Sequence, residues 1–357
     1  MKIIHIASIG NNAYSGIFVV APQHIKMQQK TEQVAFINIS NIFIEGICNQ
    51  YKYTSNFNIL SLPNPFSKPD LIVFHGVYIP AYLKIYKQLI EEKIPYIIIP
   101  HGSLTTEALN KKKMKKRVAN KLFFNNFIEK AIAIQYLSQV EYDSSHYGSN
   151  KFICTNGMSF PIERKNEFHL DKITISYIGR LDAYHKGLDL MIYAIKKVEF
   201  LLKKNNCIIN LYGPNLENQA SMIKRMIFEN NIGDIIKFHD GIVGEEKKTV
   251  LLDTDIFIQT SRFEGMPMGI LEALSYGIPC LVTIGTTLGT VVEKYNAGWC
   301  ADTSIDAIAE KISEAVQDRI NWKLKSYNAQ KLIKNEFEWN KVCEKELMFY
   351  QHFANLQ

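Results

Sequence analysis

Short runs of apolar residues recur along the chain, and polar or helix-forming segments separate them. Continuous apolar runs of this kind are typical of strands buried on both faces of a parallel sheet. In the first half of the chain they predict strands at residues 1–7, 34–39, 58–62, 71–74, 96–99, 131–134 and 152–154. Because segments with helical character, such as residues 81–92, lie between them, the pattern predicts a doubly wound α/β fold.

The same alternation resumes after a polar segment at residues 163–172. Strands are predicted there at residues 173–178, 208–213, 235–241, 255–260 and 278–282. A chain of 357 residues is long enough to form two hydrophobic cores. We therefore predict two domains, residues 1–160 and 161–338, with a hinge near residues 156–171. The last segment, residues 339–357, is predicted to form an amphipathic helix.

Composition narrows the class of protein. The apolar fraction of 47% suits a globular chain and argues against disorder. The six cysteines form no C-x-x-C pair, so neither a zinc site nor a disulfide framework is indicated. Residues 1–7 are too short for a signal sequence, and no apolar run approaches the ~20 residues that span a bilayer. These features predict a cytoplasmic protein.

The net charge of +6 is unevenly distributed, because six basic residues fall in one short stretch: Lys111, Lys112, Lys113, Lys115, Lys116 and Arg117. Residues 105–107 can cap a helix that carries them, and Met114, Val118 and Leu122 would form its apolar stripe. Such a helix can lie on an anionic membrane surface. The alternative is a solvated helix that packs on its own domain. No nucleic-acid-binding motif accompanies the cluster.

Two carboxylates bracket a turn in the second half of the chain. Glu264 and Glu272 are separated by seven residues, of which Gly265, Pro267 and Gly269 disfavour a helix interior. A loop should therefore lead into a helix that begins near Met268, where free backbone N–H groups attract an anion. Ligands of parallel sheets lie at the carboxyl ends of the strands, where this loop is expected. Spacing alone also allows a solvated loop glutamate followed by a helix-surface glutamate.

This segment resembles the E-x7-E signature of retaining glycosyltransferases of family 4. The match extends through residues 264–267 (Glu-Gly-Met-Pro) and 272–279 (Glu-Ala-Leu-Ser-Tyr-Gly-Ile-Pro), and the resemblance covers nearly the whole chain, most strongly residues 179–279. It implies the GT-B fold, in which two Rossmann-like α/β domains face each other across a cleft. The first would hold the acceptor and the second the nucleotide sugar, with the terminal helix crossing back onto the first domain. Relatives of the bacterial surface-polysaccharide type build lipopolysaccharide O-antigen, capsule or exopolysaccharide on a lipid carrier.

The resemblance also implies a donor site. Arg180 and Lys186 match the family's Gly-Arg-Leu and Lys-Gly elements, and arginine and lysine suit a diphosphate leaving group. Glu272 would bind the ribose, and Glu264 would grip the sugar. The other donor-binding residues implied are Gly16, Ile242, Val243, Gly265, Met266, Pro267, Met268 and Gly269. Gly16 is a partial match, because the family usually has two adjacent glycines there.

Two His-Gly pairs follow predicted strands, at residues 75–76 and 101–102. A histidine at the carboxyl end of a strand faces the ligand side of the sheet. His101 lies in a segment, residues 97–104, that resembles the family segment whose histidine adjoins the reacting centre, and so it is a candidate catalytic residue beside Glu264. For His75 a structural role is favoured.

We expect neither a metal nor another cofactor. Asp253 and Asp255 form a D-x-D pattern that binds metal in the other major glycosyltransferase architecture, but they precede a buried strand where family 4 has a structural aspartate. No residue presents itself as a nucleophile, which favours attack on the face that the leaving group departs from. Two alternatives are kept open, a nucleotide-sugar 2-epimerase of the same fold and a non-catalytic subunit that binds nucleotide sugar. A UDP-sugar is the favoured donor and a GDP-sugar the other possibility.

Overall fold

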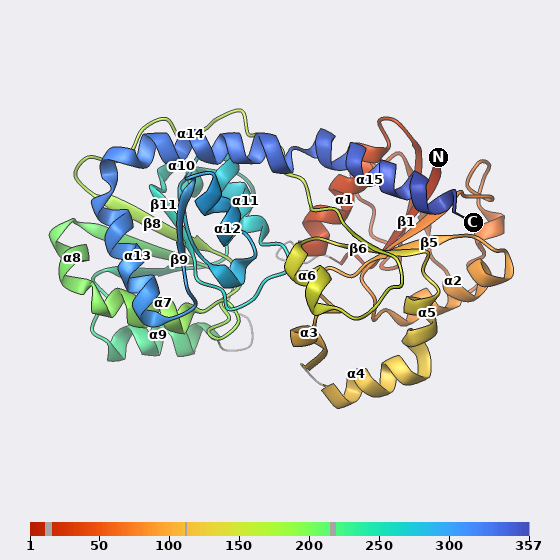
Figure 1. Ribbon diagram of the computed structural model, residues 1–357, viewed down its shortest axis with the longest axis horizontal. Helices are drawn as coiled ribbons and strands as arrows, with labels where there is room; N and C mark the ends of the chain where they lie inside the picture. The colour runs from red at the N-terminus through yellow and green to blue at the C-terminus, as the bar shows by residue number, and fades with distance from the viewer. Residues whose placement is uncertain (11–15, 111–112, 215–218, 357) are drawn as a thin grey trace. The chain divides into compact units, whose positions relative to one another are not determined.

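The structure is a computed structural model that describes residues 1–10, 16–110, 113–214 and 219–356. The chain divides into two compact units (Figure 1). The first comprises Met1–Gly157 together with Trp339–Gln357, and the second comprises Met158–Glu338. Among the described residues, no helix combines the length and the apolar character needed to cross a membrane.

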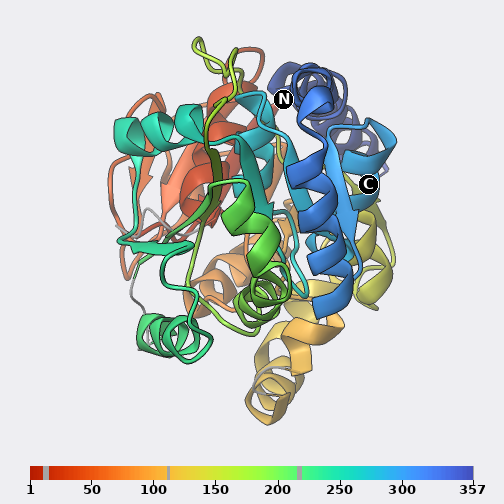
Figure 2. The ribbon, with the colours of Figure 1, turned by 90° about the vertical axis from the view of Figure 1, so that its left-hand side faces the viewer.

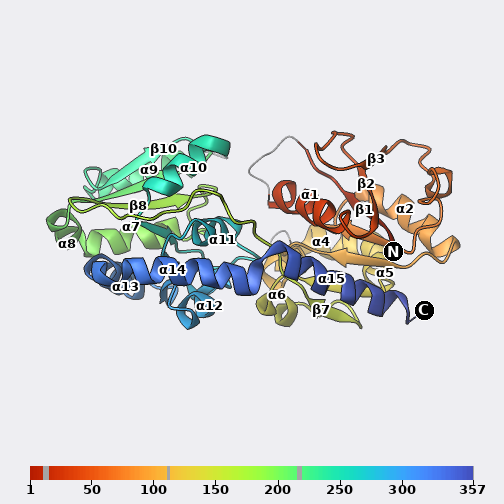
Figure 3. The ribbon, with the colours of Figure 1, turned by 90° about the horizontal axis from the view of Figure 1, so that it is seen from above.

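The first unit is built on a parallel sheet with the strand order β3-β2-β1-β4-β5-β6-β7. The strands are β1 (Lys2–Ala7), β2 (Gln33–Asn38), β3 (Asn49–Lys52), β4 (Leu71–His75), β5 (Tyr96–Ile99), β6 (Ala133–Tyr136) and β7 (Lys151–Ile153). The helices are α1 (Gly16–Gln28), α2 (Pro80–Glu91), α3 (Thr106–Asn110), α4 (Lys113–Ala119), α5 (Asn125–Glu129), α6 (Gln139–Ser144) and α15 (Trp339–Ala354). Figure 3 shows β1, β2 and β3 beside one another, with α1 over them.

The two faces of this sheet differ in character. One face is apolar, and its residues, such as Ile4, Phe74 and Ile98, pack with side chains of α2 and α5. The opposite face carries polar residues within apolar strands, including His5 and Gln135, both fully buried. Helix α1 covers that face and packs against α15. The terminal helix therefore contributes to the interior of the first unit.

The second unit has a parallel sheet with the order β10-β9-β8-β11-β12-β13. Its strands are β8 (Ile173–Ile178), β9 (Cys207–Tyr212), β10 (Ile236–His239), β11 (Ile256–Gln259), β12 (Cys280–Thr283) and β13 (Gly298–Ala301). Its helices are α7 (Leu188–Lys197), α8 (Glu199–Lys204), α9 (Gln219–Glu229), α10 (Gly244–Asp253), α11 (Met268–Ser275), α12 (Gly289–Lys294), α13 (Ile305–Gln317) and α14 (Trp322–Leu332).

Helices cover both faces of this second sheet. Helices α7, α9 and α13 share one hydrophobic core with it, and α7 lies against α13 (Figure 2). Helices α11, α12 and α14 form the core on the other face. The predicted doubly wound α/β architecture is thereby confirmed in both units. Short 3₁₀ and π segments complete the chain at Ile59–Ser61, Asn120–Phe124, Ile284–Thr286, Arg319–Asn321 and Ile333–Phe337.

The strand predictions differ from the structure in three places. Residues 58–62 form a 3₁₀ turn instead of a strand, because the Asn58 side chain accepts a hydrogen bond from Leu60 N and caps the turn. Strands β3 and β13 were not predicted. The sequence of β3, Asn-Gln-Tyr-Lys, has no apolar run, that of β13, Gly-Trp-Cys-Ala, is short and begins with glycine, and both strands lie at a sheet edge.

Candidate active site

The loop between β11 and α11 lies at the carboxyl edge of the second sheet. Helix α11 begins at Met268, which confirms the helix start predicted from the glycines and the proline. The neighbouring strand end fixes the loop, because Thr283 Oγ1 donates to Ser261 O at 2.7 Å and Thr287 Oγ1 to Gly265 O at 3.2 Å. A Cβ at Gly285 would lie 2.3 Å from Arg262 O, so the backbones of the two loops also pack directly on each other.

Glu264 is held in this loop by three donors. Its Oε1 accepts hydrogen bonds from Lys186 Nζ at 2.5 Å, from Ser261 Oγ at 2.7 Å and from Gln259 Nε2 at 2.9 Å. The Glu264 side chain is 9% exposed. Burial raises the pKa of Glu264. The Lys186 ammonium and the Ser261 hydroxyl lower it by more than burial raises it, so the net pKa lies below the usual value. Glu264 is therefore a carboxylate at neutral pH.

Lys186 reaches Glu264 because the loop after β8 packs directly on the end of β11. Gly187 has φ +61°, and a Cβ there would lie 1.9 Å from Thr260 O, so only glycine fits. Thr260 Oγ1 donates to Gly187 O at 2.9 Å and fastens the two loops together. The structure thus brings together two predicted site residues that lie 78 positions apart in the sequence.

The same pair of loops carries a second ion pair. Arg262 binds Asp189 in bidentate fashion, at 2.7 and 2.8 Å, and its guanidinium lies 4.4 Å from the centre of the Tyr184 ring. The rings of His185 and Phe263 stack with their centres 4.3 Å apart. These contacts stiffen the frame of the Lys186–Glu264 pair.

Sequence reasoning missed Ser261, Gln259, Asp189 and Arg262. Gln259 offered a signal, since it is a polar residue at the end of the otherwise apolar β11 and is buried.

Glu272 lies on α11 and forms an ion pair with Lys247 of α10. Its side chain is 29% exposed, so it borders solvent more than Glu264 does. Arg180 is exposed, its carbonyl accepts a hydrogen bond from Tyr177 at 2.6 Å, and its guanidinium has no ion-pair partner among the described residues.

The remaining predicted donor residues lie in loops and at helix starts. Ile242 is buried, whereas Val243 is half exposed and precedes the first turn of α10. The α11 start packs closely on the end of β8, since a Cβ at Gly269 would lie 3.4 Å from Ile178 O. Gly16 is the first residue of α1 in the first unit. Residues 11–15, which precede Gly16, lie outside the described residues.

His101 also belongs to the first unit, in a turn just after β5. It has φ +50° and Gly102 has φ +79°, an arrangement that is uncommon for a residue with a side chain. Its Nε2 lies 3.1 Å from Nδ1 of His75, which is fully buried. Burial, together with the positive charge of the nearby His24, lowers the pKa of His101 to about 3. The ring is therefore neutral at physiological pH.

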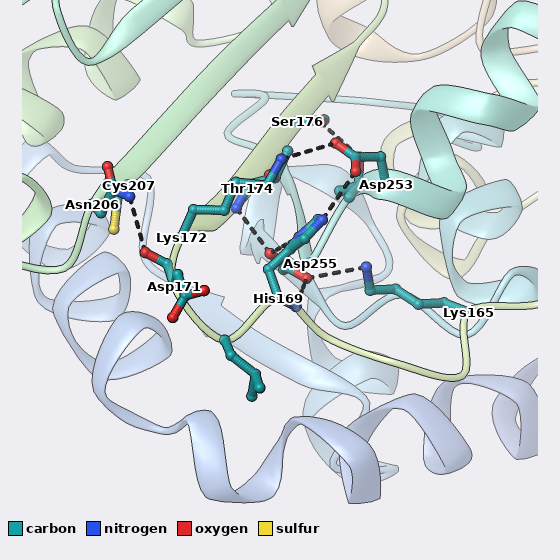
Figure 4. A network of polar contacts seen from close by, with 12 residues as sticks. Lys165, His169, Asp171, Lys172, Thr174, Ser176, Asn206, Cys207, Asp253 and Asp255 are labelled. Carbon is teal, nitrogen blue, oxygen red and sulfur yellow. Dashed lines mark hydrogen bonds and ion pairs between the residues drawn. The ribbon is translucent and has the colours of Figure 1, made fainter.

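The two aspartates of the D-x-D pattern take part in a structural network (Figure 4). Asp255 is fully buried, accepts hydrogen bonds from Thr174 N at 2.9 Å and His169 N at 3.2 Å, and forms an ion pair with Lys165 at 3.0 Å. Both aspartates contact His169, at 2.8 and 3.0 Å. Among the described residues, no cluster of three or more histidines, cysteines or carboxylates has the geometry of a metal site.

Comparisons with known proteins place this geometry in a family. The family model described as "Glycosyl transferases group 1" matches residues 159–338, which include every candidate residue of the second unit. The gpi3 subunit of the Schizosaccharomyces pombe phosphatidylinositol N-acetylglucosaminyltransferase is 24% identical over 208 residues, which is 58% of this chain and 43% of that protein. The chain spans less than half the length of the first curated relatives it matches.

Other similarities extend over the full length. An uncharacterized 41.2 kDa protein in a cps region of Klebsiella pneumoniae is 20% identical and aligns with 98% of this chain and 97% of its own. The crystal structure of Anabaena HepE in complex with UDP and glucose superposes with a TM-score of 0.75 at 15% identity, covering 98% of this chain and 99% of that chain. The fold is thus that of GT-B glycosyltransferases, and the chain belongs to the group 1 family of glycosyl transferases.

Proposed function

We propose that this chain is a retaining glycosyltransferase that moves a sugar from a nucleoside-diphosphate sugar to a hydroxyl group of a glycan or lipid-linked acceptor. The observation that carries the proposal is the pairing of Lys186 with the buried Glu264 at the carboxyl edge of the second sheet. A departing diphosphate accumulates negative charge, and preorganised cations lower the energy of that state. The Lys186 ammonium gives one N–H to Glu264 and has two more for phosphate oxygens. The exposed Arg180 would add a planar donor from the same loop.

The other residues have roles consistent with their positions. Glu272, which borders solvent, would accept hydrogen bonds from the ribose, and residues 242–243 would contact the base. Glu264 and the loop of residues 265–269 would hold the sugar. His101 of the first unit would lie beside the anomeric carbon, and Gly16 would approach the donor phosphate.

Two of the similarities support a donor and a pathway. A UDP-sugar is favoured because Anabaena HepE was solved with UDP and glucose, and a GDP-sugar is the alternative. Synthesis of a bacterial surface polysaccharide, whether O-antigen, capsule or exopolysaccharide, is supported by the full-length similarity to the protein of the Klebsiella cps region. A sugar of the hexose type is proposed.

We propose that the configuration at the anomeric carbon is retained because the acceptor attacks on the same face as the leaving group, without a metal. Glu264 Oε1 already accepts three hydrogen bonds, so this oxygen is a poor nucleophile. In the same-face route the bond from the anomeric carbon to the diphosphate breaks while the bond to the acceptor oxygen forms. The acceptor proton passes to the departing diphosphate. Lys186 and Arg180 would provide the charge stabilisation that a divalent ion provides elsewhere.

We also propose that the helix α4 binds an anionic membrane surface, which would place the protein on the cytoplasmic face of the plasma membrane. The apolar stripe on and after this helix is exposed, at 81% for Met114, 55% for Val118 and 63% for Leu122. Arg117 is exposed beside it. Figures 1 and 2 show α4 standing out from the body of the first unit. Lys111 and Lys112 lie outside the described residues. Exposed apolar groups flanked by basic residues suit a lipid surface better than water.

Thermal stabilisation by nucleotides tests the donor site. Wild type, Arg180→Ala and the control Arg225→Ala would be heated with UDP, GDP and their sugar conjugates in the presence of a chelator. Arg225 is an exposed arginine on α9, paired only with Glu229 among the described residues. Stabilisation by one nucleotide that persists in Arg225→Ala and is lost in Arg180→Ala is expected. The absence of any shift in wild type would overturn the proposal.

Assays with the same donor distinguish a transferase from the two alternatives. A 2-epimerase would isomerise the donor without an acceptor, and a non-catalytic subunit would bind it without turnover. Transfer of labelled sugar to a lipid-linked or glycan acceptor is the expected result.

A further inference from the structure

Three histidines form a diagonal row on the polar face of the first sheet. His5 on β1 lies opposite Val73 on β4, and His75 on β4 lies opposite Ile99 on β5. Each step of the row, from His5 to His75 to His101, therefore moves one strand across and two residues toward the carboxyl edge. Residues two apart on a strand share a face, so the sheet itself aligns His5 with His75, and His101 joins the row from the turn just after β5.

The rings of this row are hydrogen-bonded in sequence. His5 Nδ1 lies 2.9 Å from His75 Nε2, and His75 Nδ1 lies 3.1 Å from His101 Nε2. His5 and His75 are fully buried. The inner end of the row continues into α1, where His5 Nε2 lies 2.9 Å from Gln28 Oε1.

Gln28 connects the row to a buried carboxylate on the terminal helix α15. Glu346 is fully buried and accepts hydrogen bonds from Gln28 Nε2 at 2.6 Å and from Gln135 Nε2 at 2.7 Å. His24 Nδ1 lies 2.9 and 3.0 Å from its two oxygens. The other ring nitrogen of His24 lies 3.1 Å from Oδ1 of Asn156. Burial lowers the pKa of His24, but the Glu346 carboxylate raises it by more, so the net pKa lies above the usual value. Burial raises the pKa of Glu346, but His24 and Gln135 lower it by more, so Glu346 is a carboxylate at neutral pH.

Because Glu346 is an anion, it determines which atom donates and which accepts in each hydrogen bond from Gln28 to His101. A carboxylate only accepts, so the Gln28 amide nitrogen faces Glu346 and its carbonyl oxygen faces His5. His5 must then carry its proton on Nε2 and present a bare Nδ1, which accepts from Nε2–H of His75. By the same step the bare Nδ1 of His75 accepts from Nε2–H of His101. Each ring has one allowed tautomer, and Nδ1 of His101 is left without a proton.

The electrostatics agree with neutral rings along the row. Burial lowers the pKa of His5 to about 4, despite the hydrogen bond to Gln28, and it lowers the pKa of His75 as well. Because the rings are neutral, the row carries no net charge, and the tautomer of each ring determines the tautomer of the next. His101 Nδ1 has no hydrogen-bond partner within residues 1–10, 16–110, 113–214 and 219–356.

From this geometry we propose that His75, His5 and Gln28 are positioning residues, which lock His101 in the tautomer whose bare Nδ1 accepts a hydrogen bond from a hydroxyl of the bound sugar. The inference rests on the proposed function in one respect, the placement of His101 beside the donor sugar. It specifies what that function leaves open, namely that His101 is a hydrogen-bond acceptor toward the ligand and neither a donor nor a cation. It also gives α15 a part in the site, through Glu346.

Nitrogen-15 NMR of histidine-labelled protein tests the tautomer without any ligand. Nine histidines are present, and loss of one signal in His101→Gln assigns the ring. Wild type is expected to show a proton on Nε2 of His101 and none on Nδ1. A proton on Nδ1, or a cationic ring at pH 7, would overturn the proposal.

Two matched variants distinguish an effect that passes through the histidine row from a general effect on core packing. Gln28→Leu and Gln135→Leu each remove a buried amide that donates to Glu346, but only Gln28 lies on the path to His101. Gln28→Leu is expected to shift the His101 signal. It should also weaken binding of the nucleotide sugar about tenfold, because one hydrogen bond is lost, while binding of the nucleotide alone is unchanged. Gln135→Leu should change neither the His101 signal nor the binding of the nucleotide sugar or the nucleotide.

Equal changes in the two variants would contradict the proposal. If neither variant folds, the wild-type spectrum still decides it. Failure of wild type to bind any nucleotide sugar would instead overturn the proposed function, because the tautomer is measured independently.

Discussion

Lys186 Nζ lies 2.5 Å from Glu264 Oε1, and both side chains are largely shielded from water, at 13% and 9% exposed. Each therefore fixes the position of the other at the edge of the second sheet. Glu272 has a comparable partner in Lys247, but that pair is 29% and 24% exposed and is correspondingly more hydrated. The two glutamates of the E-x7-E segment thus occupy different electrostatic environments, and their substitution should have different effects.

Glu264→Ala is expected to lower turnover by about 10²-fold or more with donor affinity within about threefold, because it frees the cation that the transition state needs in place. Glu272→Ala is expected to raise the dissociation constant of the donor about tenfold, through the loss of ribose hydrogen bonds. Calorimetric titration with the nucleotide sugar and single-turnover rates measure the two effects. Equal affinities and equal rates in the two variants would remove the assignment of roles.

Much of the fold could be predicted because strands of a parallel sheet are buried on both faces and show as continuous apolar runs. The prediction failed where that rule does not apply, at the edge strands β3 and β13 and at residues 58–62, where a side-chain cap overrides local propensity. The candidate residues Lys186 and Glu264 could be named from their motifs, whereas their ion pair depends on the close packing of Gly187 against Thr260.

The buried polar network of the first unit could not be predicted from the sequence, for a different reason. Glu346 is 318 positions from Gln28, and no periodicity links them. A signal did exist, because His5 and Gln135 each interrupt an otherwise apolar strand and a buried polar group needs a partner. The identity of that partner is set by the folding of α15 onto α1.

Vesicle binding tests the α4 surface. Replacing Met114 and Leu122 with serine is expected to reduce cosedimentation with vesicles that contain anionic lipid about tenfold, because two exposed apolar groups no longer enter the lipid. Wild-type binding should fall as salt rises and should be absent with neutral lipid. Met348→Ser is the control, since Met348 is 70% exposed on α15, away from the basic cluster in sequence. Unchanged sedimentation of the double variant would favour a solvated helix.

The two aspartates of the D-x-D pattern should differ in their contribution to stability. Asp255→Ala leaves the buried Lys165 ammonium without its ion-pair partner and should lower the free energy of unfolding by about 3–5 kcal/mol. Asp253 is 54% exposed, so Asp253→Ala should cost less than about 1 kcal/mol. Urea titrations of both variants measure the difference. Equally large losses, reversed by a divalent cation, would indicate a shared metal ligand instead.

Glu141 should make stability depend on pH near neutrality. It is buried next to the His101–Gly102 turn, since its Oε1 lies 3.3 Å from where a Cβ of Gly102 would be. Its Oε2 accepts from Leu137 N at 2.9 Å, but Oε1 has no hydrogen-bond partner within the described residues. Burial, only partly offset by that backbone hydrogen bond, raises the pKa of Glu141 from 4.5 to about 7.

The sign of the effect follows from proton binding. Between pH 4.5 and 7 the folded protein holds a proton on Glu141 that the unfolded chain releases, so stability falls as pH rises through this window. Above pH 7 the full penalty, about 3 kcal/mol, is present. Glu141→Gln imitates the protonated form and should therefore stabilise the protein at pH 8 by up to this amount, with little effect at pH 4.5. Urea titrations at both pH values measure the change, with the exposed Glu129→Gln as the control. A stability difference between Glu141→Gln and wild type that is the same at both pH values would contradict the raised pKa.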